Sequence, residues 1–213
     1  MFKTKILSTV DSKFWNSNLL KSDYSTFFQT SEYLVEDPNA GLIPIFIHVF
    51  NDKDEIVGQL GLYVIKSSAL YSSSLLKKAL GLFTILTRRG IWLYGPIIHS
   101  KDDYERTEII KCIIDANDKI MKVHNLVFME GFSPPLDKLV NDSYLAEFEK
   151  RGYKITKFVT YITDLSKPVE EIWKKVQKYT KINVKRSAKR GITTKELETI
   201  DELKSVQIGR AHV

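Results

Sequence analysis

The sequence predicts an α/β fold, of the α+β type, because two kinds of apolar periodicity alternate along its 213 residues. Some segments place apolar residues at every second position, as half-buried strands do, and others place them at helical spacing. Clusters of Asn, Asp, Gly, Pro and Ser separate these segments. The length allows one complete domain and the opening of a second.

The first third of the chain is predicted to contain a strand, two short helices and a hairpin. The expected ranges are 3–8 for the strand, 12–20 and 30–35 for the helices, and 43–50 and 56–66 for the two strands of the hairpin. A polar turn of sequence Asn-Asp-Lys-Asp joins the hairpin strands.

The middle of the chain continues with alternating strands and helices. Strands are expected over 91–94 and 126–130, helices over 102–122 and 143–151, and a long strand over 154–163. The helix predicted over 102–122 has these inward positions: Ile110, Ile113, Ile114, Asn117 and Met121.

A strongly basic helix is predicted over 168–190. Pro168 near its start, acidic residues in its first turn and Gly191 after its end are typical helix signals. Eight Lys or Arg and no acidic residue lie between Lys174 and Arg190. One stripe should pack: Trp173, Val176, Thr180, Val184 and Ser187. A neighbouring stripe is charged: Lys174, Lys178, Lys181, Lys185 and Lys189.

Two interpretations of this basic face stay open. It is either a solvated surface or a site for an anionic partner such as a diphosphate or an RNA backbone. Its spacing favours binding, because residues at i, i+3 and i+7 can meet several phosphate oxygens at once. Tyr179 and Ile182 also lie on this outer side.

Composition narrows the classes of function. The net charge of +6 is modest and concentrated in the basic helix, which argues against a general nucleic-acid coat. A single cysteine, Cys112, excludes an internal disulfide and a cysteine-based metal site. His48, His99 and His124 stand singly, without zinc-ligand spacing. No secretory signal is visible in residues 1–15, so we expect a cytoplasmic protein.

The segment 75–86 is the most apolar of the chain. At about a dozen residues it is too short to span a bilayer, so no transmembrane segment is expected. Its helical apolar stripe suits either peripheral contact with the inner face of the membrane or packing on the sheet.

The basic helix and the segment before it resemble a known family. Tyr161-Ile-Thr-Asp-Leu-Ser166 leads toward Lys178-Tyr-Thr-Lys-Ile-Asn-Val-Lys-Arg-Ser-Ala-Lys-Arg-Gly-Ile192. Together they resemble the Fem family, the peptidoglycan-bridge aminoacyltransferases. Lys181 and Lys185 stand at the positions of family arginines, while Asn183, Val184 and Gly191 stand at those of the family Asn, Ile and Gly.

Two upstream segments are also similar to this family. Phe27-Phe-Gln-Thr-Ser-Glu-Tyr33 resembles its early Phe-Gln-Ser/Thr segment, and Leu93-Tyr-Gly-Pro-Ile97 resembles its Arg-Gly-Pro strand end, with Tyr94 where Arg is usual. Phe28 and Tyr33 equally suit plain core aromatics, and Gly95-Pro96 equally suits a simple turn.

The resemblance implies a GNAT-like (acetyltransferase-like) fold, with a mixed, mostly antiparallel sheet flanked by helices. Fem proteins are built from two such units. We therefore expect a first GNAT-like domain over 1–165 and the beginning of a second over 166–207.

The implied activity joins an amino acid or acyl group to an amine of a phosphate-bearing, cell-wall-type precursor, a sugar phosphate or a lipid-linked molecule. Aminoacyl-tRNA is the donor that the family implies. We expect no other cofactor, and no acetyl-CoA, because 95–103 has one glycine, a proline and two acids at the helix start. A phosphate- or RNA-binding module and an N-acyltransferase for polysaccharide or protein amines are the alternatives.

The expected substrate-binding residues follow from the basic stripe and the motifs. Phosphate contacts are assigned to Lys178, Lys181, Lys185 and Lys189, with Asn183, Tyr94 and Tyr179 as secondary residues. No catalytic residue and no metal site are predicted. Glu130 and Asp164 end predicted strands, but Asp164 also suits orientation of the turn that follows it.

The last six residues, Ile208-Gly-Arg-Ala-His-Val213, can be encoded by ATC GGA AGA GCA CAC GTC, a common sequencing adapter. We expect this tail to be foreign to the protein and to hold no site residue. The chain would then be a fragment, and we expect it to be inactive without its continuation.

Overall fold

The computed structural model of the chain describes residues 2–36, 41–65, 88–135, 142–158, 162–194 and 199. It divides the chain into two units, residues 1–158 and 159–213, which are described separately. The segments predicted over 75–86 and 208–213 lie outside the described residues.

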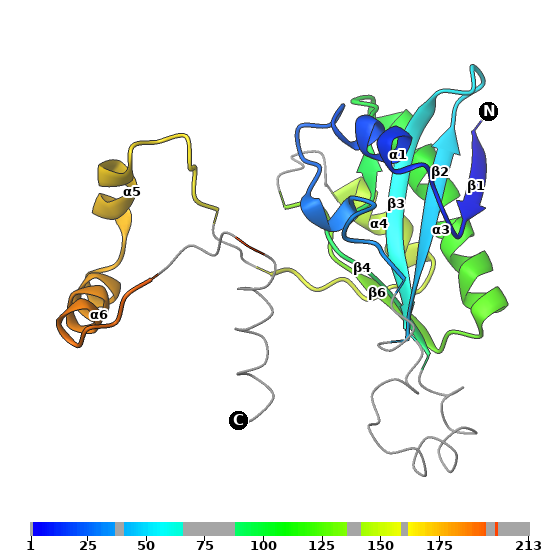
Figure 1. Cartoon of the computed structure of the whole chain (residues 1–213). Helices are drawn as coiled ribbons and strands as arrows, with labels where there is room; N and C mark the ends of the chain where they lie inside the picture. Colours follow the sequence, from blue (N-terminus) through cyan, green and yellow to red (C-terminus); the bar gives the residue numbers. More distant parts are fainter. Residues whose placement is uncertain are drawn as a thin grey trace, which may run out of the picture. The chain divides into compact units, whose positions relative to one another are not determined.

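The first unit is built on a six-stranded sheet (Figure 1). Its path runs β1-β2-β3-β4-β6, and β5 also pairs with β3. Neighbours are antiparallel except β4 and β6, which run parallel. The strands are β1 (Lys3–Leu7), β2 (Leu42–Phe50), β3 (Ile56–Ile65), β4 (Arg89–Trp92), β5 (Ile97–Ile98) and β6 (Phe128–Gly131).

Helices cover both faces of this sheet. Figure 1 shows α1 (Ser12–Leu19) in front of the strands and α3 (Asp103–His124) behind them. The short helix η1 (Phe27–Gln29) follows α1, and α4 (Asp142–Lys150) packs beside α3. Asp102 caps α3 by accepting a hydrogen bond from the amide of Glu105 at 2.9 Å. Its carboxylate thus provides the acceptor for an N–H group in the first turn, which has no partner within the helix.

Alternation along the strands creates two cores. Leu60, Leu62 and Val64 point to the α3 face, where they meet the apolar stripe of α3. Phe46 and Tyr63 point to the other face and pack with Trp15 of α1, which is fully buried. Leu42 and Ile43 follow the same rule, since each packs partly buried against a different core.

The predicted fold class, a mixed and mostly antiparallel sheet flanked by helices, is confirmed. The hairpin and the helices predicted over 12–20, 102–122 and 143–151 are present within two residues at each end. All five positions predicted to point inward from the helix over 102–122 are buried or pack partly buried against the core.

Two predicted elements of this unit are wrong. The helix expected over 30–35 is a set of turns after η1, because its backbone is used in tertiary bonds: the Tyr63 hydroxyl donates to the carbonyl of Tyr33 and accepts from the amide of Val35. The long strand expected over 154–163 is absent from its described residues, although Ile155 still packs against the core.

The second unit contains α5 (Val169–Lys175) and α6 (Lys178–Lys189). The single helix predicted over 168–190 is therefore wrong, since Val176 and Gln177 have extended ψ angles of 134° and 143°. The break relieves crowding of like charges, because it removes Lys174, Lys175 and Lys178 from neighbouring positions of one helix.

The apolar stripe predicted to pack in this unit is not buried. Neither α5 nor α6 contains a buried residue, and Trp173 and Val184 are 39% and 48% exposed. Among all described helices, none is both long and apolar enough to cross a bilayer.

Candidate functional site

A strand bulge lies next to η1, where β4 and β5 both pair with β3. Tyr63 pairs with Ile91, and Gln59 pairs with Ile97. Four residue steps separate the two partners on β3, whereas six steps separate them on the other chain segment. The segment from Leu93 to Pro96 therefore bulges out between β4 and β5, where sequence reasoning placed the end of a simple strand.

The backbone of the bulge has unusual geometry. Tyr94 has a positive φ of 53°, and the peptide bond between Gly95 and Pro96 is cis. A side chain at Gly95 would lie 2.7 Å from Leu60 Cδ1 and 3.1 Å from the amide of Gln29. A side chain here would displace Leu60 and crowd the buried amide of Gln29, so the Gly95-Pro96 pair is more than a simple turn.

Gln29 fastens this bulge from the η1 side. Its side-chain amide accepts from Gly61 N at 2.8 Å and donates to the carbonyls of Gly61 at 3.1 Å and Leu93 at 2.7 Å. Gln29 is fully buried, and its own carbonyl accepts from Trp15 Nε1 at 2.7 Å. A single side chain thus takes the place of the missing strand partner of Gly61.

β6 and the core hold the other side of the bulge. Gly95 N donates to the carbonyl of Phe132 at 3.0 Å, and Phe132 N donates to that of Trp92 at 3.2 Å. The indole of Trp92 donates to the carbonyl of Gly95 at 3.0 Å. The parallel pair therefore stays connected beyond the end of β6, and the bulge cannot move as a free loop.

Two consecutive amides of the bulge have no hydrogen-bond partner among the described residues. Among the described residues, none accepts a hydrogen bond from the backbone N–H of Leu93 or Tyr94. Gly61, which faces this position on β3, is already paired with Gln29. Adjacent N–H groups in a rigid backbone can donate together to an oxyanion.

Aromatic rings surround the bulge on its outer side. Phe28 contacts Tyr94 at 5.2 Å and Tyr33 at 5.1 Å between ring centroids. Tyr94 in turn contacts Phe132 at 6.2 Å, and Phe132 contacts Phe158 at 6.1 Å. Phe28 and Tyr33, for which a plain core role was an alternative, are half-buried and line a pocket of about 220 Å³.

Ionisable groups near the bulge are few. Glu130 on β6 lies 3.6 Å from Arg89, and both side chains are more than a third exposed. Within the described ranges, no three His, Cys, Asp or Glu side chains could hold a metal ion. Cys112 is half-buried, and burial raises the pKa of its thiol, which disfavours the reactive thiolate.

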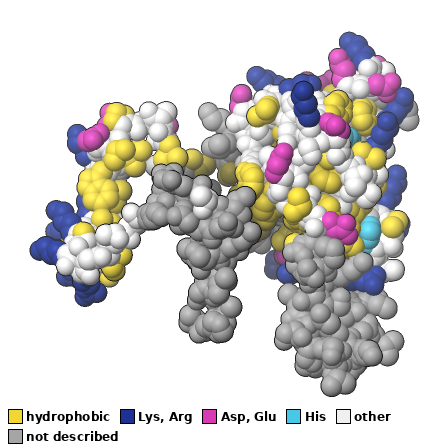
Figure 2. All heavy atoms as spheres, in the orientation of Figure 1, with side chains coloured by type: hydrophobic (Ala, Val, Ile, Leu, Met, Phe, Trp, Pro, Cys, Tyr) yellow, Lys and Arg dark blue, Asp and Glu magenta, His cyan; other side chains and the backbone are white. Residues whose placement is uncertain are grey.

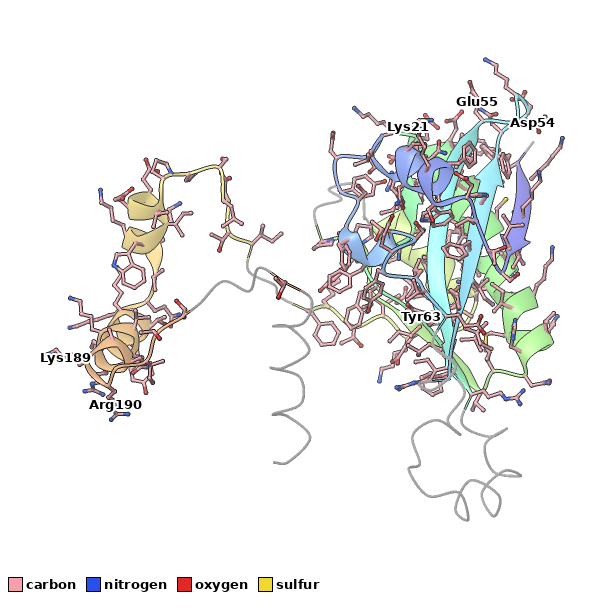
Figure 3. The ribbon with its side chains drawn as sticks, in the orientation of Figure 1. Lys21, Asp54, Glu55, Tyr63, Lys189 and Arg190 are labelled. Atoms are coloured by element: carbon pink, nitrogen blue, oxygen red, sulfur yellow. The ribbon has the colours of Figure 1, made fainter. Side chains whose placement is uncertain are left out.

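The predicted substrate-binding residues fall into both units. Tyr94 lies at the bulge of the first unit, and the other six lie on α6 of the second. Lys178, Lys185 and Lys189 are exposed, and no described carboxylate forms an ion pair with them. Figure 2 shows Lys and Arg side chains gathered around α6, and Figure 3 shows Lys189 and Arg190 at its end.

Lys181, Asn183 and Tyr179 complete the predicted set. Lys181 is half-buried, because its Nζ donates to the carbonyl of Lys174 at 3.1 Å and lies 6.0 Å from the ring of Trp173. Asn183 is half-buried and Tyr179 is 70% exposed. Asp164 accepts from the amide and the hydroxyl of Ser166, which lowers its pKa, so it orients the turn before α5.

Sequence reasoning missed Gln29 and the bulge amides. The motif containing Gln29 was visible, and a single Gln between Phe28 and Thr30 is the signal that could have revealed a buried amide. The amides of Leu93 and Tyr94 carry no sequence signal, because every residue but proline has one.

No protein-family model and no curated protein matches the chain. Among solved structures, one described as a probable acetyltransferase has a TM-score of 0.44 and 14% identity, over 78% of this chain and 99% of that chain. The aminoglycoside antibiotic 6'-N-acetyltransferase AAC(6')-Ih from Acinetobacter baumannii has a TM-score of 0.42 and 12% identity, over 76% and 98%. Likeness at this level assigns no family, so the Fem resemblance stays a prediction.

Proposed function

We propose that the protein is an N-acyltransferase whose reaction centre is the bulge between β4 and β5. The observation that carries this proposal is the pair of unpaired amides at Leu93 and Tyr94, held by Gln29 on one side and Phe132 on the other. An acyl carbonyl placed there would find N–H donors that have no described acceptor.

The chemistry follows from that placement. An amine attacks the carbonyl carbon of an ester or thioester, a C–N bond forms, and negative charge develops on the carbonyl oxygen. Donors that are fixed in advance stabilise this charge without reorganisation, and positioning of the two reactants lowers the barrier further. Collapse of the tetrahedral intermediate breaks the C–O or C–S bond to the donor, and the departing alcohol or thiol takes the proton that the amine loses.

The finer proposal concerns donor and acceptor. We propose an amino acid or acyl group as the transferred group, with aminoacyl-tRNA as donor, and an amine of a phosphate-bearing, cell-wall-type precursor as acceptor. Lys178, Lys185 and Lys189 support it, because their exposed ammonium groups lack ion pairs with described residues. Acetyl-CoA is the less favoured donor, since Asp102 caps the helix that follows the bulge.

The test compares amide formation by the chain joined to its expected continuation with amide formation by the Gln29→Leu variant of the same protein. Radiolabelled aminoacyl-tRNA and, separately, acetyl-CoA are incubated with amine-bearing sugar phosphates, and amide products are detected by mass spectrometry. We expect kcat to fall at least tenfold in Gln29→Leu and to be unchanged in Gln177→Leu, an exposed glutamine of the second unit. Absence of any amide product, or equal kcat in all three proteins, would contradict the proposal.

Phosphate binding by α6 alone is the second candidate function. Its exposed lysines could bind an RNA backbone without any acyl transfer. The affinity of such binding falls steeply with salt. The logarithm of the binding constant changes with the logarithm of the salt concentration with a slope of about −0.7 per phosphate contacted on a single strand. This affinity does not depend on base sequence. A titration of the full chain with RNA homopolymers at several salt concentrations therefore separates it from saturable, weakly salt-dependent binding of a small precursor.

A further inference from the structure

A pocket of about 220 Å³ lies on the η1 face of the sheet. Phe28 and Tyr33 line it from the η1 segment, and Leu42, Tyr63, Ile65 and Ile91 line it from three adjacent strands. Figure 3 labels Tyr63 on β3, far from the turn that carries Asp54 and Glu55. Leu93 also lines the pocket, so it adjoins the bulge whose amides are unpaired.

The lining favours an uncharged ligand. Apart from the hydroxyls of Tyr33 and Tyr63, no side chain that lines the pocket is acidic or basic. The hydroxyl of Tyr63 is already engaged, because it donates to the carbonyl of Tyr33 and accepts from Val35 N at 3.0 Å. A charged group placed here would lose its hydration without gaining a partner.

The size of the pocket limits the group that it can hold. An apolar cavity of about 150 Å³ in another protein holds benzene. At about 220 Å³ this pocket accommodates one six-membered ring with a short substituent, or a branched chain of equal bulk, but no nucleotide. Phe28 and Tyr33 already meet edge to face with an interplanar angle of 77°, a geometry that a further ring can extend.

We propose that this pocket binds a single-ring or branched apolar group of the substrate whose carbonyl sits at the bulge. Assignment to a substrate rests on the proposed acyl transfer, whereas the binding of such a group does not. The ring belongs to either the transferred acyl group or the acceptor amine, and both sources share this chemistry.

The test measures binding of three amides to the full chain by shifts of backbone ¹⁵N–¹H signals. Phenylacetamide carries its ring on the acyl side, N-benzylacetamide carries it on the amine side, and acetamide has no ring. We expect saturable shifts at Gly61 and Leu93 with at least one ring-bearing amide, and at least tenfold weaker binding of acetamide. The tighter of the two ring-bearing amides identifies the side on which the natural ring lies.

Matched variants locate the site. Leu42→Trp fills the pocket, whereas Ile43→Trp places the same bulk on the other face of the same strand, where Ile43 packs against the α3 core. We expect binding to weaken at least tenfold in Leu42→Trp and to persist in Ile43→Trp. Ile65→Phe is a milder pocket-filling variant if Leu42→Trp fails to fold.

Either of two results would overturn the proposal: no saturable shift with the ring-bearing amides, or equal affinity in the pocket-filling variants and the parent chain. Saturable binding without any amide product in the transfer assay would leave the pocket in place and remove only the proposed acyl transfer.

Discussion

Gln29 is the residue on which the candidate site depends most. It is an amide among aromatic and aliphatic side chains, and its hydrogen bonds connect β3 to the bulge. Gln29, Gly61 and Gly95 are all buried, so these hydrogen bonds lie in the interior of the first unit. At the scale of residues, the geometry of the bulge therefore depends on the Gln29 side chain and on the glycines around it.

Replacement of Gln29 by leucine should destabilise the first unit. Leucine has a similar volume but leaves Gly61 N, Gly61 O and the Leu93 carbonyl without their partner, at a cost of roughly 1–3 kcal/mol for each buried group left unpaired. Urea denaturation measures the loss. Gln177→Leu is the control and should leave the midpoint unchanged, because Gln177 is exposed and forms no capping bond.

Two histidines should make stability depend on pH. Burial lowers the pKa of His48 and of His99 from 6.5 to about 4, with smaller contributions from Lys5 and Lys21. The unfolded chain then binds more protons than the folded chain between pH 4 and 6.5. The free energy of unfolding is therefore fully retained above pH 6.5 and is lost as the pH falls toward 4.

Urea titrations at several pH values measure this loss. Each histidine contributes a slope of up to about 1.4 kcal/mol per pH unit. His48→Phe removes one of the two contributions and suits the rings of Trp15 and Phe50 around it. A slope that stays the same in His48→Phe and in His99→Phe would assign the acid sensitivity to other groups.

At the scale of elements, sequence periodicity predicts those helices and strands whose positions are determined by burial alone. The helix over 102–122 and the hairpin strands were predictable, because their apolar residues face one core or the other at fixed spacing. The turns after η1, the bulge at Leu93 and the break at Val176 were not. Tertiary hydrogen bonds, close backbone approach and charge repulsion determine these three, and periodicity does not report them.

The helix α6 should gain stability when one of its lysines becomes acidic. Lys185→Glu places a carboxylate four residues from Lys181 and from Lys189, and each such pair contributes about 0.2–0.5 kcal/mol. Cα chemical shifts of α6 should move toward helical values, while affinity for tripolyphosphate should fall. Lys157→Glu, an equal charge change in the first unit, should affect neither. Undiminished affinity in Lys185→Glu would exclude α6 as the phosphate site.

At the scale of the whole molecule, the described buried apolar side chains all belong to the first unit. The last of them in sequence is Phe148, and α5 and α6 contain none. Cooperative unfolding reports buried apolar area, so the described part of the second unit should contribute little to it.

Truncation after Phe158 should therefore leave the thermal midpoint of the first unit unchanged within a few degrees. Circular dichroism and calorimetry of residues 1–158 and of the full chain make the comparison. A midpoint that falls by more than about 4 °C would mean that the second unit contributes roughly 1 kcal/mol or more to stability, because 1 kcal/mol shifts the midpoint of a chain of this size by about 2–4 °C.

Hydrogen exchange of its backbone amides can report directly on the bulge. The Gly95 amide donates to Phe132, and the Ile98 amide donates to the Tyr24 hydroxyl, so both should exchange slowly with deuterated solvent. The amides of Leu93 and Tyr94 lie just before them without described acceptors and should exchange fast. Two fast-exchanging amide protons next to slowly exchanging ones form a spectroscopic marker that needs no label. A ligand whose oxygen binds there would slow the exchange of both protons at once.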